Sequence, residues 1–241
     1  MRLSKNLGAL LLAMGLLFAN VAFAVEPLPT NLMAFHSDQG TELLKRSATV
    51  NTAYLLENFT TQDTQTYCGV ASAVMVLNSL IVANAPIDPA YDPNKYFTQK
   101  NFFTKNVLNI LKPENVLAKG MTLADMTQAL STFDGVSAQY FNVTDKLSLP
   151  EFITITTTAL SKGQYVTVNF LRTQLGFKTG GGHHSPVAAY DEKTRQFLIL
   201  DVARYKYPAF WVSADDLWKA MNTLDDDAKA NRGFIVIDKR R

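Results

Sequence analysis

The sequence of residues 62–80 is QDTQTYCGVASAVMVLNSL. From Cys68 onward, apolar residues recur at helical spacing and also fill the flanking positions, which indicates a helix buried nearly all round. Cys68 should then lie in the first turn, where unpaired backbone N–H groups and the helix dipole stabilise a thiolate. The polar residues Thr64, Gln65 and Thr66 before it argue against a packed core thiol. This stretch therefore predicts a central helix that begins with a reactive cysteine.

Residues 1–24 have the composition of an export signal. Two basic residues precede the uncharged apolar run Leu7–Ala19, and small residues follow it in the pattern that a signal peptidase cleaves. The run has 13 residues, fewer than the ~20 that a helix needs to cross a bilayer. We therefore expect cleavage after Ala24 and an exported, periplasmic protein with no membrane anchor after cleavage.

Size and charge limit what the rest of the chain can be. The sequence has 241 residues, of which 47% are hydrophobic and 18% charged, enough to bury the core of one domain. Loss of Arg2 and Lys5 with the leader lowers the basic count from 23 to 21, which equals the 21 acidic residues. A chain without net charge gives no electrostatic reason to expect nucleic acid or an anionic membrane as partner. We expect a single domain over residues 25–241.

The order of helical and strand patterns predicts the fold class. Besides the cysteine helix, helical spacing marks residues 104–111, 121–133, 150–160 and 214–221, and Thr122 with Asp125 forms a capping pair. Strand patterns with β-branched and aromatic residues occupy 164–170, 186–190, 197–200 and 233–237. Helices first and antiparallel strands last indicate an α+β domain with two lobes and a substrate cleft between them.

Cys68 is the only cysteine of the chain, so it cannot form an intramolecular disulfide. A lone thiol in an oxidising compartment is either buried as an inert small side chain or kept for its chemistry. The count alone leaves both interpretations open, and the polar approach to the cysteine helix favours the second.

Residues 179–186, Thr-Gly-Gly-Gly-His-His-Ser-Pro, place two histidines directly after a glycine run. Gly182 and the glycines before it let a substrate come close to the main chain. Adjacent residues of an extended segment point to opposite faces, so His183 and His184 cannot both bind one metal ion. With one thiol and three histidines in the chain, we expect no metal site and take His183 as a catalytic candidate.

Hairpin geometry predicts that Asp201 lies beside His183. If the strands that contain Tyr190 and Phe197 are joined by a turn centred near residue 192 or 193, His183 and Asp201 fall opposite one another. Directly opposed residues share one face of a sheet at about 4.5–5.5 Å. A slip of one residue would separate them, and the alternative is a carboxylate that only caps the end of a strand.

Cys68, His183 and Asp201 together provide a nucleophile, a base and an orienting acid. A thiolate attacks a carbonyl, His183 protonates the departing amine, and Asp201 holds the ring in the required tautomer. The backbone N–H of Cys68 and the side chain of Gln62 are the candidates for stabilising the oxyanion. The alternative for Gln62 is a solvated loop glutamine, which the residues alone leave open.

Several long motifs, in this order, resemble the catalytic domain of phytochelatin synthases. They are Tyr-Cys-Gly-Val-Ala-Ser and Val-Leu-Asn-Ser-Leu within 67–80, Gly-His-His-Ser-Pro at 182–186, Asp-Val-Ala-Arg-Tyr-Lys-Tyr-Pro at 201–208, Trp-Val at 211–212, Leu-Trp-Lys-Ala-Met at 217–221 and Arg-Gly-Phe at 232–234. The resemblance covers most of residues 36–237. It implies a papain-like cysteine protease fold, with a helical lobe that carries the nucleophile helix and an antiparallel β-sheet lobe. It places the catalytic triad on Cys68, His183 and Asp201, and the oxyanion-hole glutamine on Gln62.

The resemblance also implies residues that bind the substrate. Asp225 resembles the residue that meets the α-amino group of the γ-glutamyl unit, and Arg232 the residue that meets its carboxylate. Gly182 belongs to the glycine-rich approach to the histidine. Arg204 and Lys206 follow the catalytic aspartate and are second-rank candidates, which serve either a second substrate or only the fold.

The implied reaction is transfer of a γ-glutamylcysteine unit from glutathione. Cys68 attacks the carbonyl between cysteine and glycine, glycine leaves, and the acyl group passes to water or to a second glutathione. The products are γ-glutamylcysteine in the first case and phytochelatin in the second. Plant and yeast members carry a further cysteine-rich C-terminal region linked to metal response, whereas this sequence ends at Arg241. We therefore expect hydrolysis to dominate and phytochelatin synthesis, with its role in heavy-metal detoxification, to be minor.

No cofactor is expected to be required, and cadmium, zinc or copper ions would stimulate the reaction as thiolate complexes of glutathione. The sequence leaves open whether the protein forms a homodimer. Two other functions compete with this one: a general papain-like peptidase that acts on short peptides, and an exported protein that binds metals or thiols without turnover. Glycine release, and its loss in a Cys68→Ser variant, would separate the enzyme from the binding protein.

Overall fold

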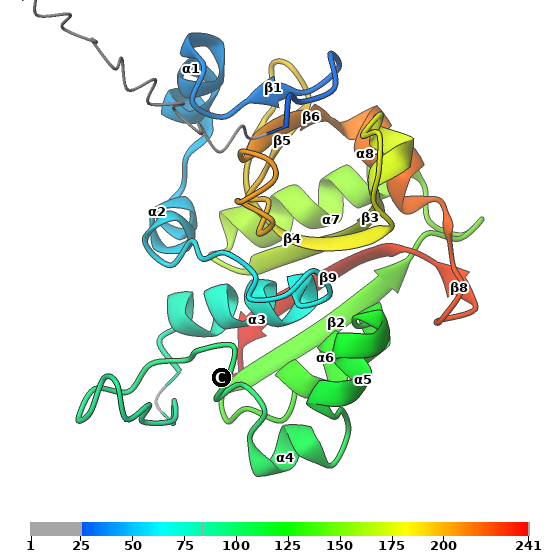
Figure 1. Ribbon diagram of the computed structural model, residues 1–241. Helices are drawn as coiled ribbons and strands as arrows, with labels where there is room; N and C mark the ends of the chain where they lie inside the picture. Colours follow the sequence, from blue (N-terminus) through cyan, green and yellow to red (C-terminus); the bar gives the residue numbers. More distant parts are fainter. Residues whose placement is uncertain (1–25, 83, 241) are drawn as a thin grey trace, which may run out of the picture.

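The structure is a computed structural model that describes residues 26–82 and 84–240 (Figure 1). The export signal predicted over residues 1–24 lies outside the described residues. The helices are α1 Asp38–Ser47, α2 Val50–Glu57, α3 Cys68–Ser79, α4 Lys105–Leu108, α5 Pro113–Lys119, α6 Leu123–Leu130, α7 Leu149–Ser161, the 3₁₀ helix η1 Arg172–Leu175, and α8 Ala214–Met221. The strands are β1 Met33–Ala34, β2 Val136–Asn142, β3 Tyr165–Leu171, β4 Gly182–Asp191, β5 Gln196–Ile199, β6 Phe210–Ser213, β7 Leu224–Asp225, β8 Ala230–Asn231 and β9 Gly233–Lys239. None of the helices described here is long and apolar enough to span a bilayer.

Seven of these strands form one antiparallel sheet in the order β1-β6-β5-β4-β3-β9-β2. The long strands β3 and β4 are neighbours at its centre, and Phe170 of β3 pairs with His183 of β4. The short strands β7 and β8 pair only with each other, as a hairpin outside the main sheet. The predicted α+β class is therefore correct, and the mixture of helices and antiparallel sheet is that of a two-lobed papain-like fold.

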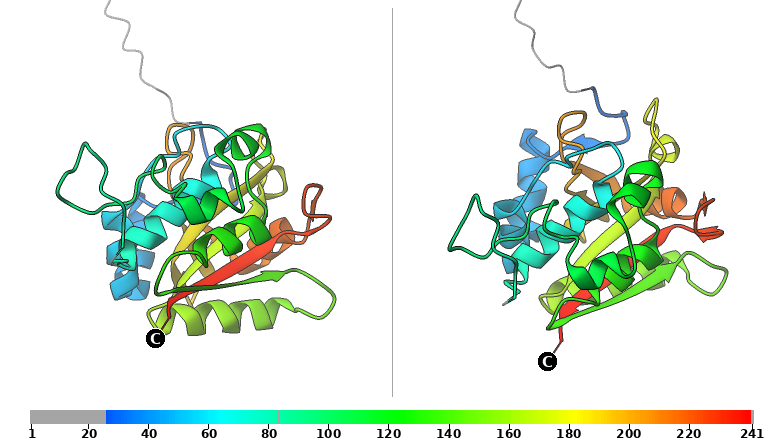
Figure 2. Two further views of the ribbon diagram at one scale, coloured as in Figure 1. Left: turned by 90° about the horizontal axis from the view of Figure 1, so that it is seen from below. Right: turned by 60° about the horizontal axis from the view of Figure 1, so that its bottom comes forward.

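The sheet is covered on both faces, which explains why its strands read as continuous apolar runs. Along β5, Leu198 packs into the same hydrophobic cluster as α3, while Phe197 and Ile199 pack into the cluster of α7 and α8. Figure 2 shows α7 on one side of β2 and β9, and α3 and α6 on the other. Helix α3 lies against β4 with every residue except Asn78 buried. The prediction of a central helix, buried nearly all round, is confirmed.

The elements with strong local signals lie where the sequence predicted them. Helix α8 has the predicted bounds, α7 carries its proline in the first turn, and Thr122 and Asp125 form the predicted capping box of α6. Two predicted helices are shorter than expected, since α4 has four residues and α6 eight. The sequence analysis did not identify α2, α5, β6 or β2. Strand β2 also breaks the expected order of helices followed by strands, because it precedes α7 and pairs with the last strand β9.

Candidate active site

Cys68 is the first residue of α3 and sits at the edge of the core. Its side chain is 6% exposed, and it lines a cavity beside the sheet. The hydroxyl of Ser72, one turn further along α3, donates to the backbone oxygen of His184 at 3.2 Å. This buried hydrogen bond ties the nucleophile helix to β4 and thus fixes the position of Cys68 relative to the histidines.

His183 and Asp201 lie side by side in the interior. His183 Nε2 is 2.9 Å from Asp201 Oδ1, and both side chains are buried. The register predicted to oppose them is wrong, because continuation of the pairing of Val187 with Ile199 would place His183 opposite Ala203, and the ladder between β4 and β5 ends at Val187. Asp201 reaches His183 from the loop that follows β5, and not as its cross-strand partner.

The three side chains stabilise one another as ions. Burial alone would raise the pKa of the Cys68 thiol, but hydrogen bonds from His183 and from the backbone of His184 lower it below its usual value. Burial acts to lower the pKa of His183, yet the charge of Asp201 and the hydrogen bonds to Asp201 and Cys68 raise it. Burial likewise opposes ionisation of Asp201, but the neighbouring His183 lowers its pKa to about 2. The arrangement therefore favours a thiolate and an imidazolium beside an ionised carboxylate.

Arg172 is a fourth buried member of this centre that the sequence analysis did not identify. It begins η1, and its Nη2 donates to Asp201 Oδ1 at 2.8 Å. A basic residue directly after β3, of which every residue except Leu171 is buried, was the available signal, since a buried arginine there requires a partner.

His184 points away from His183 and has a different environment. Its Nε2 lies 2.9 Å from the backbone oxygen of Met121 and 3.1 Å from Asn169 Nδ2. Because a carbonyl oxygen only accepts, Nε2 carries the proton that is donated to Met121. Burial lowers the pKa of His184 to about 4, so the ring is neutral at neutral pH. The two adjacent histidines therefore point in opposite directions, and their pKa values are shifted in opposite directions as well: His183 upward and His184 downward.

Gln62 lies near His183, and both line a second cavity. The Gln62 side chain is buried, so it is not a solvated loop residue. Its Nε2 donates to the backbone oxygen of Thr64 at 2.7 Å and to the hydroxyl of Tyr205 at 3.3 Å, while its Oε1 has no hydrogen-bond partner among the described residues. Release of either hydrogen bond would free an N–H of this amide for an oxyanion.

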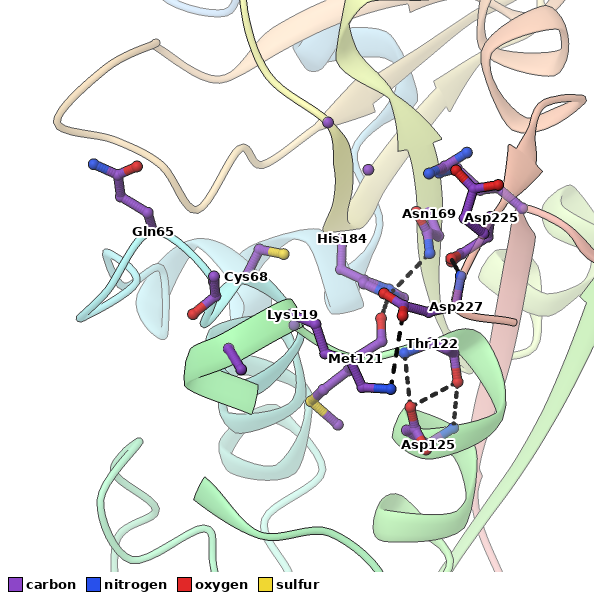
Figure 3. A pocket seen from close by; sticks show the side chains of 17 residues that line it. Gln65, Cys68, Lys119, Met121, Thr122, Asp125, Asn169, His184, Asp225 and Asp227 are labelled. Atoms are coloured by element: carbon purple, nitrogen blue, oxygen red, sulfur yellow. Dashed lines mark hydrogen bonds and ion pairs between the residues drawn. The ribbon is translucent and has the colours of Figure 1, made fainter. Parts of the chain in front are cut away.

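The first cavity, of about 430 Å³, is bounded by both lobes and opens beside Cys68 (Figure 3). Arg232 and Asp225, the two substrate-binding candidates, both line it. Arg232 Nη1 donates to Thr223 Oγ1 at 3.2 Å and to the backbone oxygen of Leu224, but its buried Nε has no partner among the residues described. A Cβ atom at Gly182 would lie 2.8 Å from this Nε, so only glycine leaves room for the guanidinium.

An ion pair crosses the mouth of the first cavity. Lys119 Nζ, at the end of α5, is 3.7 Å from Asp227 Oδ1 in the hairpin of β7 and β8, and Figure 3 shows the two side chains meeting. Both side chains are about half exposed, so this pair contributes little to stability.

The second cavity, of about 470 Å³, adjoins the first at Gln65, Gly181 and Gly182 and is lined by His183. Lys206 and Arg172 line it together with Glu26 and Tyr205. Lys206 Nζ donates to Thr179 Oγ1 at 2.9 Å and is 3.7 Å from the carboxylate of Glu26.

Arg204, the other second-rank candidate, lines neither of the two cavities. Its guanidinium lies 4.5 Å from the ring centroid of Phe59 and donates to the backbone oxygen of that residue at 3.0 Å. The structure thus brings Lys206 to the site and leaves Arg204 on the surface, where it fastens the loop before α3.

No group of three or more His, Cys, Asp or Glu side chains within residues 26–82 and 84–240 is arranged to hold a metal ion. Four aspartates, Asp125, Asp225, Asp226 and Asp227, line the first cavity together with two cations, Lys119 and Arg232. They form a mixed-charge wall, suited to an organic zwitterion.

The fold and this centre define the class: a papain-like α+β architecture with a cysteine at a helix N-terminus, a histidine on the facing sheet and an aspartate from the loop after β5. The family profile described as phytochelatin synthase matches residues 23–234. The chain therefore belongs to the phytochelatin synthase family, as its motifs indicated.

Individual relatives support this assignment. Glutathione gamma-glutamylcysteinyltransferase 3 of Lotus japonicus is 31% identical over 77% of this chain and 37% of its own length. Glutathione gamma-glutamylcysteinyltransferase 1 of Triticum aestivum is 33% identical over 77% of this chain and 35% of its own. The glutathione gamma-glutamylcysteinyltransferase of Schizosaccharomyces pombe is 28% identical over 90% of this chain and 51% of its own. The chain spans between about a third and a half of the length of these relatives.

Proposed function

We propose that this protein is a cysteine-dependent enzyme that transfers the γ-glutamylcysteine unit of glutathione. The observation that carries the proposal is the hydrogen-bonded set of Cys68, His183 and Asp201 beside a cavity lined by Arg232 and Asp225. Family membership and the names of the relatives point to the same substrate.

The first cavity suits the γ-glutamyl end of glutathione, which carries an α-amino group and an α-carboxylate on one carbon. Arg232, whose buried Nε has no hydrogen-bond partner among the described residues, supplies the positive charge for the carboxylate, and Asp225 meets the amino group. Gly182 lets the substrate lie against the main chain of β4. With this end fixed, the peptide extends along the cavity toward the sulfur of Cys68.

In the first half-reaction, the Cys68 sulfur forms a bond to the carbonyl carbon between the cysteine and glycine of glutathione. The carbonyl π electrons move onto oxygen, and their return expels the glycine nitrogen, which takes the proton from His183. Asp201 holds His183 at Nε2, which leaves Nδ1 to exchange this proton with sulfur and amine. The step produces a thioester on Cys68 and free glycine.

The tetrahedral intermediate requires donors for its oxyanion. The backbone N–H of Cys68 lies in the first turn of α3, where no intrahelical acceptor uses it. Gln62 supplies the second donor once the substrate oxygen displaces Tyr205 from its amide, the longer of the two hydrogen bonds.

In the second half-reaction, the thioester is attacked from the side of the second cavity, and His183 removes the proton of the attacking group. Water gives γ-glutamylcysteine, and the amino group of a second glutathione gives phytochelatin. Tyr205 in this cavity is 52% exposed, so water has access to the thioester. We propose that hydrolysis dominates and that Lys206 assists the minor transfer reaction by meeting a carboxylate of the second glutathione.

The proposed function also includes where the protein acts and how metal ions enter the reaction. The protein is exported to the periplasm, acts without a resident cofactor, and receives cadmium, zinc or copper only as thiolate complexes of glutathione. The ions are then part of the substrate and not of the enzyme. Addition of cadmium should therefore change the rate of glycine release from glutathione. It should not change the rate of Cys68 alkylation measured without glutathione.

The test is an intact-mass spectrum taken shortly after the protein is mixed with glutathione. We expect an adduct of γ-glutamylcysteine mass on Cys68, glycine in solution, and more γ-glutamylcysteine than phytochelatin. Cys68→Ser should keep the fold and lose both adduct and glycine release. A dominant phytochelatin product would contradict the proposed order of the two reactions.

The same assay separates the competing functions. A general papain-like peptidase would cleave α-linked tripeptides as fast as glutathione, whereas Arg232 and Asp225 should favour the γ-linked substrate. A protein that only binds thiols or metals would release no glycine and would retain its ligand in the Cys68→Ser variant.

A further inference from the structure

We propose that Arg172 is a positioning residue of the active site, which fixes Asp201 and weakens the hold of Asp201 on the proton of His183. His183 then remains acidic enough to protonate the departing amine. The inference rests on the proposed function, because it assumes that Cys68, His183 and Asp201 act as one catalytic unit.

Arg172 and His183 share a single carboxylate oxygen. Arg172 Nη2 donates to Asp201 Oδ1 at 2.8 Å and lies 2.7 Å from Oδ2. His183 Nε2 and the backbone N–H of Ala203 also contact Oδ1, at 2.9 Å and 2.8 Å. Three donors therefore compete for one oxygen, and one of them carries a permanent charge. Asp201 cannot give His183 the full stabilisation that an unshared carboxylate would provide.

The surroundings of Arg172 hold its guanidinium in one place. It lies over the packed pair of Phe177 and Tyr207 rings, 5.1 Å and 5.0 Å from their centroids, which are 4.4 Å apart. Gly180 has a φ of +117°, and a Cβ atom there would come 2.7 Å from Arg172 Cδ. Glycine is therefore required both for the backbone conformation and for the loop to close over the arginine.

The burial of this pair argues for a role beyond stability. Arg172 is 5% exposed and Asp201 fully buried, and Arg172 Nη1 has no hydrogen-bond partner among the described residues. A buried ion pair is weak evidence for stabilisation, because desolvation offsets much of the attraction. Arg172 is held firmly although its Nη1 is unpaired, and this arrangement fits control of Asp201 better than a contribution to stability.

Arg172 acts on all three members of the triad through its charge. It lowers the pKa of Cys68 and of Asp201, which favours their ionised forms, and it lowers the pKa of His183, which favours proton release. The net direction for His183 is still upward, so Arg172 moderates the effect of Asp201 without cancelling it. The other charged or titratable groups that face this centre are His184 from β4, Tyr205, Lys206 and Tyr207 from the loop after β5, and Glu26 beside Lys206.

The experiment measures the rate at which iodoacetamide alkylates Cys68 between about pH 4 and pH 10, followed by intact mass. The full chain is compared with Arg172→Gln, which removes the charge, and Arg172→Lys, which keeps it. Arg46→Met is the matched control, because Arg46 also pairs with an aspartate of the β4–β5 hairpin, Asp191, far along the strand from the catalytic centre. Glycine release from glutathione is recorded over the same pH range.

We expect the alkylation midpoint of Arg172→Gln to move up by about one pH unit, so that alkylation on the acid side slows about ten-fold. The alkaline limit of glycine release should move up as well, because His183 holds its proton more firmly. Arg172→Lys should keep both midpoints and release glycine about ten-fold more slowly, because an ammonium cannot reproduce the planar set of N–H donors of the guanidinium. Arg46→Met should change neither.

A purely structural role would lower the amount of active protein in Arg172→Gln and leave its midpoints in place, and that result would overturn the inference. If Arg172→Gln does not fold, Arg172→Lys decides: a wild-type rate of glycine release contradicts a positioning role. A wild-type Cys68 that reacts with the pH profile of a free thiol would overturn the proposed triad itself. Because alkylation does not require glutathione, a wrong substrate assignment would abolish the glycine readout in every variant and leave the shift of the alkylation midpoint in Arg172→Gln unaffected.

Discussion

The cavity lined by Cys68 and the adjoining cavity lined by His183 each contain one cation proposed to bind substrate, and these two cations are held in opposite ways. In the first, Arg232 is buried and tied to the segment around Thr223, and Gly182 lies against its guanidinium. In the second, Lys206 extends toward Glu26 and Thr179, and the neighbouring Tyr205 is largely exposed. Arg232 is thus built into the core, whereas Lys206 is partly exposed and held by surface contacts.

This difference separates two tasks of an acyl-transfer enzyme. A rigid cavity recognises one acyl group, because a fixed, partly unpaired arginine penalises any ligand without a matching carboxylate. An open cavity accepts whatever attacks the thioester, so water and peptide amines compete there. Changes in the first cavity should therefore alter substrate choice, and changes in the second should alter the product.

The largest effect should come from disrupting the catalytic triad, which serves both cavities. Asp201→Asn should reduce glycine release about 10³-fold to 10⁴-fold, because the amide cannot stabilise the imidazolium. The matched control is Asp191→Asn at the other end of β4, since Asp191 also has its pKa lowered to about 2, but by Arg46 and Thr194. The control should cost stability and keep the rate. Equal losses of rate in both variants would contradict a catalytic role for Asp201.

The next largest effect should come from the rigid cavity. Arg232→Met should lower kcat/KM for glutathione about 100-fold, mainly through KM, because a charged hydrogen bond to the substrate is lost. The rate of Cys68 alkylation should stay within about two-fold of wild type, since Arg232 does not contact the triad. An unchanged KM would show that the carboxylate binds elsewhere.

How far the sequence alone predicts this site depends on the distance over which each signal acts. Cys68 was found because its helix carries a local pattern, and α3 begins at that residue. Asp201 was found by an argument about register that proved wrong, since the pairing of Val187 with Ile199 would place Asp201 opposite Ser185 and not His183. The proximity to His183 survives because the loop after β5 leaves the sheet beside β4.

The remaining features depend on tertiary contacts that no local pattern encodes. Arg172 is 29 residues from Asp201, and His184 is 63 residues from its acceptor at Met121. Strand β2, with the sequence VSAQYFN, escaped notice because it is an edge strand whose Val, Tyr and Phe do not alternate with polar residues and of which only Val136 is buried. These elements become visible only when the sheet is assembled.

A smaller effect should come from the open cavity. Lys206→Met should lower the ratio of phytochelatin to γ-glutamylcysteine about three-fold to ten-fold and leave the rate of glycine release nearly unchanged, because an exposed charge contributes modestly to binding. The measurement is the product ratio by mass spectrometry at high glutathione concentration. Arg204→Met is the control, since Arg204 lines neither cavity. A loss of glycine release in Lys206→Met would mean that the two cavities do not divide the tasks as described.

The smallest effect on catalysis should come from His184, the neutral histidine in the wall of the rigid cavity. This residue has a separate effect on stability. His184 has its pKa lowered to about 4 by burial, whereas an unfolded chain binds the proton near its ordinary value. As pH falls below about 6.5 the unfolded state takes up this proton first, so the free energy of unfolding decreases until about pH 4, by at most about 3 kcal/mol. Asp201 and Asp191 contribute only below this window, because their pKa values are lowered to about 2. In His184→Gln, the urea unfolding midpoint should change less with pH between about pH 6.5 and pH 4.5 than in the wild type. An unaltered pH dependence would show that His184 is protonated in the folded protein.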